Sequence, residues 1–220
     1  MTRVFLVDDQ ALVRAGLRMV IDAQPDMSVV GEAQDGREAL ERLAVTTADV
    51  ALMDVRMPRL DGVAATRALI ERDGDAPPRV LVLTTFDLDE YVFPALRAGA
   101  SGFMLKNIDP EELLAAIRAV ASGDAIVAPT ATRRLLEHVA GTLPAEPVDD
   151  SRLATLSDRE RTILLEVARG RSNAEIAAAL HLAEATVKTY LGRLRAKLDL
   201  RDRVQLVIFA YDSGLVAPRR

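Results

Sequence analysis

Five polar side chains follow or close short apolar runs of the kind that form buried strands: Asp8, Asp9, Asp54, Thr84 and Lys106. In open α/β sheets the carboxyl ends of parallel strands meet along one edge, and that edge is where such folds carry their chemistry. Three carboxylates gathered there would repel one another and raise one another's pKa unless a cation joined them. Mg²⁺ suits that place because it prefers hard oxygen ligands, commonly one or two carboxylates with phosphate and water.

Phosphoryl transfer to a carboxylate would use all of these groups. The reaction needs a nucleophile, a divalent cation and a second positive charge, because negative charge collects on the equatorial oxygens of the transferred group. Asp54 is the predicted phosphoacceptor, Lys106 can pair with a phosphate oxygen, and Thr84 offers a hydroxyl to the same group. We expect Gly62 to leave space beside the new phosphoryl group.

Each of these residues also has an ordinary explanation. Asp9 could cap the helix that follows it, Asp54 could be a loop acid, and Lys106 could be a solvated lysine. Thr84 could be a strand-end hydroxyl without further function. The shared position of all five at the same ends of their strands favours one common site over these separate explanations.

The elements that position these residues alternate between strand and helix over the first 122 residues. Apolar runs predict strands over residues 3–7, 28–33, 50–53, 79–84 and 101–105. Helical spacing predicts helices over residues 12–21, 36–45, 62–72 and 110–122, with a further helix between the last two strands. This order predicts an α/β fold with a doubly wound, five-stranded parallel sheet covered by helices on both faces.

The alternation stops after Gly123, and a small all-α domain is predicted at residues 153–220. Residues 123–152 are predicted to be a linker that contains one helix. Two Ser-x-x-Glu capping boxes, at Ser157 and Ser172, predict where two helices begin. Helices are expected over residues 129–139, 157–169, 172–180, 184–198 and 202–213. A short helix, a tight turn and a longer helix give a helix-turn-helix outline.

The helix over residues 184–198 has one apolar face and one face of small, basic and hydroxyl-bearing residues. The second face carries Ala185, Lys188, Thr189, Gly192 and Ala196, with Arg193 and Arg195 at its flanks. Small residues beside a lysine suit a helix that enters the major groove of DNA. A helical bundle with a purely structural role is the alternative.

Composition describes a globular protein with two differently charged ends. Half of the residues are hydrophobic, and the absence of cysteine excludes disulfides and thiolate metal sites. Residues 151–220 hold 13 basic against 8 acidic side chains, whereas residues 1–150 hold 15 against 25. This asymmetry suggests that the second domain binds a polyanion. Without a signal peptide or membrane-spanning run, a cytoplasmic protein with no membrane contact is expected.

Four motifs over residues 1–122 resemble the flavodoxin-like receiver domain of two-component response regulators. They are Asp8-Asp9, Asp54-x-x-Met57-Pro58-x-x-Asp61-Gly62, Thr84-Thr85 and Gly102-Phe103-Met104-Leu105-Lys106. The resemblance implies Asp54 as phosphoacceptor and Asp9 as the main Mg²⁺ carboxylate, with Asp8 acting directly or through water. The backbone carbonyl of Arg56 would be another ligand. Phe103 would be the switch aromatic, turning inward when Thr84 moves toward the phosphate; a plain core role is its alternative.

Residues 153–216 resemble the LuxR-type helix-turn-helix of the NarL/FixJ family. The motifs are Leu156-Ser157-x-Arg159-Glu160, Ser172-Asn173-x-Glu175-Ile176-Ala177, Thr186-Val187-Lys188 and Arg201-x-Arg203-Val204-Gln205. The resemblance implies that double-stranded DNA is contacted by Lys188, Thr189, Gly192 and Arg193, and its phosphate backbone by Asn173, Thr186 and Lys197. Ala183 stands where a capping serine is usual, which is expected to weaken the start of the recognition helix by ~1 kcal/mol.

Together the two resemblances predict a response regulator that is phosphorylated by a sensor histidine kinase and binds DNA, as a homodimer when phosphorylated or on DNA. It would be no enzyme beyond catalysing its own phosphorylation and dephosphorylation. One rival is a haloacid-dehalogenase-like phosphatase, whose Asp-x-Asp signature is absent because Asp8 and Asp9 are adjacent. The other is a regulator whose receiver only dimerises, against which the complete polar set argues.

Overall fold

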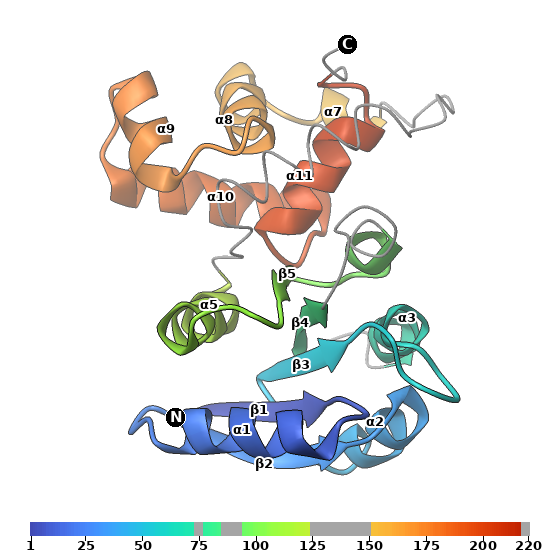
Figure 1. The fold of residues 1–220 in the computed structure, drawn as a ribbon. Helices are drawn as coiled ribbons and strands as arrows, with labels where there is room; N and C mark the ends of the chain where they lie inside the picture. Colours follow the sequence, from blue (N-terminus) through green and yellow to red (C-terminus); the bar gives the residue numbers. More distant parts are fainter. Residues whose placement is uncertain (73–76, 85–93, 124–150, 217–220) are drawn as a thin grey trace. The chain divides into compact units, whose positions relative to one another are not determined.

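The structure, a computed structural model, describes residues 1–72, 77–84, 94–123 and 151–216 of the 220-residue chain. The chain divides into two compact units, Met1–Ile126 and Val127–Arg220, which run from blue to green and from orange to red in Figure 1. The helix predicted over residues 129–139 lies outside the described residues, as does nearly all of the predicted linker. No helix in the described part of the chain combines the length and apolar character needed to cross a membrane.

The N-terminal unit is built on a five-stranded parallel sheet in the order β2-β1-β3-β4-β5. Its strands are β1 (Thr2–Val7), β2 (Met27–Ala33), β3 (Val50–Asp54), β4 (Arg79–Thr84) and β5 (Gly102–Leu105). This order places β3 between β1 and β4, so that residues at the carboxyl ends of all three strands share one edge. The predicted fold class is confirmed.

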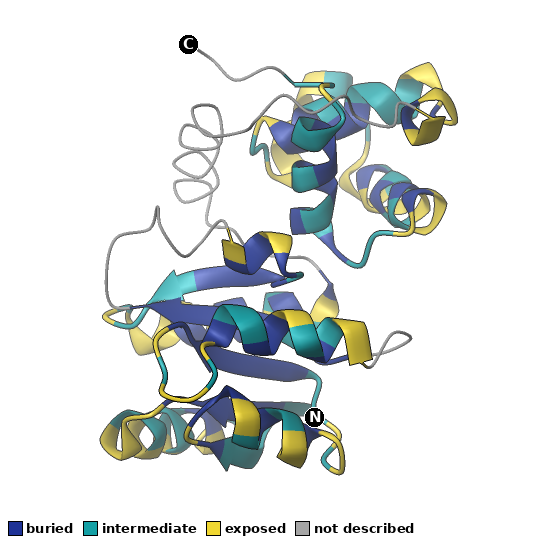
Figure 2. Ribbon diagram, turned by 90° about the vertical axis from the view of Figure 1, so that its right-hand side faces the viewer, coloured by how far each residue is buried: buried dark blue, intermediate teal, exposed yellow. Residues whose placement is uncertain are grey.

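Helices cover both faces of this sheet. They include α1 (Ala11–Asp22), α2 (Gly36–Leu43), α3 (Gly62–Arg72) and α5 (Pro110–Ser122). Figure 1 shows α1 and α5 on one face and α2 with α3 on the other. Every residue of β3 is buried, and Figure 2 shows the inner strands mainly in dark blue between helices with yellow outer surfaces. Burial on both faces explains why β3 and β4 read as nearly continuous apolar runs.

Local sequence sets where several of these helices begin and end. The side chain of Asp35 caps α2 by accepting from two backbone N–H groups of its first turn. Asp109 caps α5 by accepting from the backbone N–H of Glu111, with Pro110 at the start of the helix and Gly123 in the left-handed conformation after its end. Proline at the start and glycine at the end are the residues that these positions favour.

The C-terminal unit is helical. It contains α7 (Ser151–Ala154), α8 (Asp158–Ala168), α9 (Asn173–Leu180), α10 (Glu184–Leu198) and α11 (Arg203–Asp212). Ser157 and Ser172 form both predicted capping boxes. His181, in the left-handed conformation at φ 52°, ends α9 before the turn into α10. The helix-turn-helix outline is confirmed, and its core includes the apolar face of α10.

The short helix α7 was not predicted, because it falls at the end of the segment interpreted as linker. Its four residues are too few to show a helical period. Leu153, which is 3% exposed, anchors it to the core of the C-terminal unit.

Candidate functional site

Asp8, Asp54 and Lys106 form a compact charged cluster at the carboxyl edge of the sheet. The ammonium nitrogen of Lys106 lies 2.7 Å from Asp8 Oδ2 and 2.8 Å from Asp54 Oδ2. The three side chains are between 2% and 9% exposed. One buried cation therefore bridges two buried carboxylates, which is the pairing that buried charges require.

Three strands deliver these groups from distant parts of the sequence. Asp54 is the last residue of β3, and Asp8 follows the neighbouring β1 directly. Lys106 follows β5, and its backbone N–H donates to the carbonyl oxygen of Thr84 at the end of β4 (2.8 Å). The prediction that these residues share one edge of the sheet agrees with this geometry.

Asp9 is exposed and stands beside the cluster. Carboxylate oxygens of Asp8, Asp9 and Asp54 lie within 4.8 Å of one another. Helix α1 has Gln10 as its N-cap and no side-chain capping hydrogen bond. The ordinary explanation of Asp9 as a helix cap is therefore wrong, and its carboxylate faces the position where a cation would bind.

The donor set fits Mg²⁺. Three carboxylate oxygens at this separation can contribute to one coordination sphere, and oxygen is the ligand that Mg²⁺ prefers. Asp9 is exposed, so it would offer a ligand at little cost in desolvation. Asp8 and Asp54 already share one positive charge, so a divalent ion would supply the balance for all three carboxylates.

Burial raises the pKa of Asp54 above its ordinary value of 3.8, and the adjacent Lys106 only partly offsets this effect. Burial alone would lower the pKa of Lys106, but its hydrogen bonds to Asp54 and Asp8 outweigh burial and raise it. Lys106 is therefore a cation at neutral pH. The ionised form of Asp54 is less favoured in the folded protein than in water, and a metal ion would relieve that penalty.

Thr84 and Phe103 lie on the neighbouring strands β4 and β5, and both are buried. Phe103 is paired with Val82 of β4, and both residues lie two positions before the last residue of their strands. Its buried position is compatible with the core role, and a switch between two positions stays a prediction. Arg56 is exposed two residues after β3, and its carbonyl as a metal ligand also stays a prediction.

Gly62 is required by the backbone of Asp54. Its N–H donates to the carbonyl oxygen of Val55 (2.9 Å), and a Cβ at this position would lie 2.0 Å from the carbonyl oxygen of Asp54. Glycine therefore allows α3 to begin directly against the end of β3. The close contact is with the main chain of Asp54, and the expected space beside a phosphoryl group stays a prediction.

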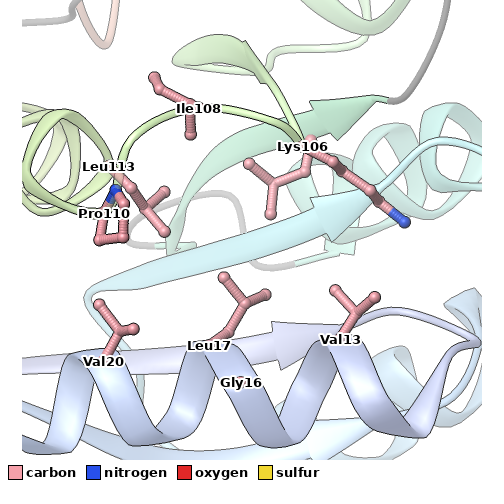
Figure 3. A pocket seen from close by; sticks show the side chains of 9 residues that line it. Val13, Gly16, Leu17, Val20, Lys106, Ile108, Pro110 and Leu113 are labelled. Carbon is pink, nitrogen blue, oxygen red and sulfur yellow. The ribbon is translucent and has the colours of Figure 1, made fainter.

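A cavity of about 100 Å³ lies between α1 and α5 beside this cluster. Its lining includes Val13 and Leu17 of α1 and Leu113 of α5, together with Lys106. In Figure 3 the aliphatic stem of Lys106 runs along this apolar lining and its nitrogen points away from it. The lysine thus buries its stem and presents its charge at the edge of the sheet.

An ion pair between the loop after β3 and the start of α2 was not predicted. The guanidinium of Arg59 pairs with the carboxylate of Asp35, which is fully buried. The dipeptide Asp35-Gly36 before a helical run signals a helix cap, but nothing in the sequence identifies a partner on a separate loop.

In the C-terminal unit, α10 exposes the face that was predicted to contact DNA. Lys188, Thr189 and Arg193 are exposed, whereas Val187 and Leu191 are buried in the core. The Thr189 hydroxyl donates to a backbone carbonyl one helical turn earlier (3.0 Å). Lys188 and Arg193 place two exposed positive charges on this part of α10.

Gly192 lies in the middle of α10 without an internal reason to be glycine. A Cβ at this position would meet no other atom within 4 Å. Glycine in a helix interior costs up to ~1 kcal/mol relative to alanine. Packing within the described part of the unit therefore does not require glycine at this position.

Two predicted phosphate contacts are engaged within the unit. Asn173 Oδ1 accepts from Arg203 (2.8 Å), and the Lys197 ammonium lies 2.9 Å from a carboxylate oxygen of Glu160. Thr186 is partly buried at the start of α10, where Ala183 makes no side-chain cap, as predicted. Lys197 would have to exchange Glu160 for a phosphate to bind DNA.

Two family models match the chain. Residues 4–118 match the response regulator receiver domain, and residues 154–210 match the luxR family of bacterial regulatory proteins. Both matches fall inside the segments for which the sequence motifs indicated these domains.

Relatives match over nearly the full length. An uncharacterised transcriptional regulatory protein of Bacillus subtilis, YxjL, is 41% identical over 97% of each chain. The DNA-binding transcriptional activator DevR/DosR of Mycobacterium tuberculosis is 40% identical over 96% of this chain and 94% of its own. The crystal structure of the response regulator ChrA, from a heme-sensing two-component system, is 36% identical with a TM-score of 0.52 over 97% of this chain and 98% of its own.

Proposed function

Since this chain belongs to the response regulators that join a receiver domain to a LuxR-type DNA-binding domain, we propose that Asp54 is its phosphoacceptor. Its relatives are transcriptional regulatory proteins of two-component systems, and the chain is a transcription regulator of that kind. The observation that carries the assignment of Asp54 is its buried carboxylate, bridged by Lys106 and within reach of Asp8 and Asp9.

In the proposed reaction a carboxylate oxygen of Asp54 attacks the phosphorus of a phosphohistidine or small phosphodonor. The new O–P bond forms as the bond from phosphorus to the donor breaks. Mg²⁺, held by Asp8, Asp9 and Asp54, would neutralise the charge that collects on the phosphoryl oxygens. Lys106 now lies 2.8 Å from Asp54 Oδ2, so it needs only to exchange that oxygen for a phosphoryl oxygen.

Thr84 is the proposed hydroxyl donor to the phosphoryl group, and Phe103 the proposed reporter of its arrival. Both are buried on adjacent strands, Thr84 paired with Leu105 and Phe103 with Val82, and the proposal is that a shift of Thr84 changes the space available to Phe103. If Thr84 and Phe103 have two discrete packings, phosphorylation of Asp54 would switch them from one to the other. This switch would change the surface of the helices in the N-terminal unit.

For the C-terminal unit, we assign double-stranded DNA as the ligand and α10 as the helix that enters the major groove. Lys188, Thr189, Gly192 and Arg193 are the proposed groove contacts, with Asn173, Thr186 and Lys197 on the phosphate backbone. The exposed basic face and the relative named as a DNA-binding transcriptional activator support this assignment. A sensor histidine kinase as phosphoryl source, a homodimer on DNA and a cytoplasmic location complete the proposal.

The phosphoacceptor assignment predicts a mass increase of one phosphoryl group when the protein is incubated with Mg²⁺ and a small phosphodonor. Asp54→Ala should abolish that increase, because it removes the proposed nucleophile, whereas Asp8, the other carboxylate beside Lys106, is a proposed Mg²⁺ ligand. Asp61→Asn is the matched control, since Asp61 lies on the same loop and its side chain caps the start of α3. Equal phosphorylation of the Asp54 variant and the wild type, measured by intact mass, would refute the assignment.

Gly192→Ala should change stability and DNA affinity in opposite directions. The free energy of unfolding should rise by up to ~1 kcal/mol, because alanine is the better helix former and its Cβ meets nothing within the unit. DNA affinity should fall about tenfold, the loss of one close groove contact.

Gly16→Ala is the control for this prediction, because Gly16 is also helical with open space around its Cβ, but lies in α1 of the other unit. That variant should gain helix stability and keep its DNA affinity. The DNA affinity of both variants is measured with fragmented genomic DNA at a fixed salt concentration. An unchanged affinity in Gly192→Ala would show that α10 does not contact DNA at Gly192.

A further inference from the structure

The loop Val55–Asp61, which follows Asp54 and is here called the acceptor loop, is held by the start of α2. Asp35 is fully buried, and one carboxylate oxygen accepts from two backbone N–H groups at the start of α2 (2.9 and 3.0 Å). The other oxygen pairs with the guanidinium of Arg59 on the acceptor loop. One buried carboxylate thus caps a helix and holds a loop.

A second contact joins the same two segments. The N–H of Gly36 donates to the carbonyl oxygen of Leu60 (3.1 Å). A Cβ on Gly36 would lie 2.7 Å from that oxygen and 2.7 Å from the Cβ of Ala65 in α3. The first turn of α2 therefore packs directly against the acceptor loop, without room for a side chain between them.

Arg59 is an unusual choice for its backbone conformation. Its φ of 66° lies in the left-handed region, which costs a residue with a Cβ roughly 1–2 kcal/mol and a glycine nearly nothing. Half of its side chain is exposed, so burial of the stem does not explain it. The ion pair with Asp35 is the interaction that an arginine gains and a glycine would lack.

The acceptor loop is also fixed at its ends. The N–H of Val55 donates to Leu83 in β4 (3.3 Å), and the N–H of Gly62 donates to the carbonyl of Val55 (2.9 Å). Arg56, whose carbonyl is a proposed Mg²⁺ ligand, lies between these end contacts and the Arg59–Asp35 pair. A change of backbone conformation in the middle of the acceptor loop would therefore move the carbonyl oxygen of Arg56.

We propose that the Arg59–Asp35 ion pair is a positioning device that holds the acceptor loop in its Mg²⁺-binding conformation. The inference rests on the proposed function, because the metal serves phosphorylation of Asp54. Neither residue touches the metal; both act through the loop backbone. Residues that orient the ligands of a metal without binding it typically alter metal affinity by 10- to 100-fold when they are removed.

Two single substitutions separate positioning from simple electrostatics. Arg59→Gly removes a positive charge and suits the left-handed backbone, whereas Asp35→Asn removes a negative charge and can keep the helix cap. Electrostatics alone would make Arg59→Gly bind Mg²⁺ more tightly and Asp35→Asn more weakly. Positioning predicts about tenfold weaker binding in both, as measured by titration calorimetry with MgCl₂ and the full-length chain.

A coupled readout completes the test. The Mg²⁺ concentration for half-maximal phosphorylation should rise in both variants, while the rate at saturating Mg²⁺ changes little. The double variant should bind Mg²⁺ no more weakly than either single variant, because both substitutions break the same contact. Arg59→Lys, which retains the charge, should recover part of the affinity, and Arg42→Ala, which breaks a surface pair on α2, should retain all of it.

The proposal is overturned if Arg59→Gly binds Mg²⁺ as tightly as the wild type or more tightly. If Asp35→Asn fails to fold, Arg59→Gly still decides the question, since it removes no buried group. Wild-type protein that binds Mg²⁺ but never gains a phosphoryl group would instead overturn the proposed function and leave the loop measurement intact.

Discussion

Lys106→Met should lower the free energy of unfolding at pH 7 by about 3 kcal/mol when Mg²⁺ is absent, because it leaves buried carboxylates without their countercharge. In the wild type the lysine lies within 2.8 Å of both Asp8 and Asp54. Methionine retains much of the apolar stem that lines the cavity between α1 and α5. The loss should be measured by urea unfolding, followed through the amide signals of β3 so that only the N-terminal unit is observed.

Mg²⁺ should restore much of this stability. A ligand that binds only the folded state stabilises it in proportion to the logarithm of its concentration over its dissociation constant. The variant should bind Mg²⁺ more tightly than the wild type, because no ammonium group competes for the carboxylates. Phosphorylation should nevertheless be poor, since the second positive charge on the phosphoryl oxygens is missing.

The stability deficit should also depend on pH in a defined direction. Burial raises the folded pKa of Asp54 above 3.8, so the folded state holds this proton more strongly and loses stability as pH rises through that raised value. Without Lys106 the pKa rises further, and the deficit should be small in acid and grow toward neutrality. It should shrink again above pH 10.5, as the raised folded pKa of Lys106 is passed in the wild type.

Lys197→Met is the matched control for this lysine. Lys197 pairs with Glu160 at the surface of the C-terminal unit, and its side chain is 37% exposed. Exposed pairs contribute only about 0–1 kcal/mol, so this variant should lose little stability and gain none from Mg²⁺. A loss of similar size in both variants, or no Mg²⁺ recovery in Lys106→Met, would contradict the buried-cluster account.

Gly62→Ala should destabilise the N-terminal unit by about 3 kcal/mol and reduce the rate of phosphorylation about 100-fold. Its Cβ would lie 2.0 Å from the carbonyl oxygen of Asp54 and 2.9 Å from the carbonyl carbon. Both atoms belong to the main chain, so β3 or α3 must shift, and overpacking of this kind costs 1–3 kcal/mol or more. Misplacement of a reacting group by about 1 Å can cost about 100-fold in rate.

The same unfolding measurement and the rate of phosphoryl incorporation check this prediction. Gly16→Ala is again the control, because it adds a methyl group to a helix of the same unit without a clash. It should be neutral or stabilising and should leave phosphorylation unchanged. A Gly62→Ala protein of wild-type stability would show that the approach of α3 to β3 can relax more easily than its geometry indicates.

The sequence was sufficient to predict the inner strands β3 and β4 because they are buried on both faces. That burial produces nearly unbroken apolar runs, and the polar residue at the end of each run marks the shared edge. The sequence alone therefore predicts that Asp8, Asp54, Thr84 and Lys106 lie together. The two capping boxes at Ser157 and Ser172 were equally clear, because the pairing of a serine with a glutamate three residues later is local.

Contacts between distant segments were not predictable in the same way. The pairing of Arg59 with Asp35 and that of Lys197 with Glu160 depend on how two elements lie against each other. From the sequence, Gly62 was expected only to leave space beside the phosphoryl group. Its close approach to the carbonyl oxygen of Asp54 depends on the path of the backbone between β3 and α3, which the sequence does not show. Helix α7 was missed because four residues carry no period.

The strand order also governs when the buried cluster becomes complete as the chain is synthesised. Asp8 follows the first strand and Lys106 follows the last, while the strands between them pair only with parallel neighbours. Parallel pairings of this kind have high contact order and form late, because loop entropy is lost before contacts are gained. During synthesis, Asp8 and Asp54 therefore leave the ribosome before Lys106, the lysine that neutralises them. Completion of the sheet and neutralisation of the cluster become the same event, which couples readiness for phosphorylation to completed folding of the N-terminal unit.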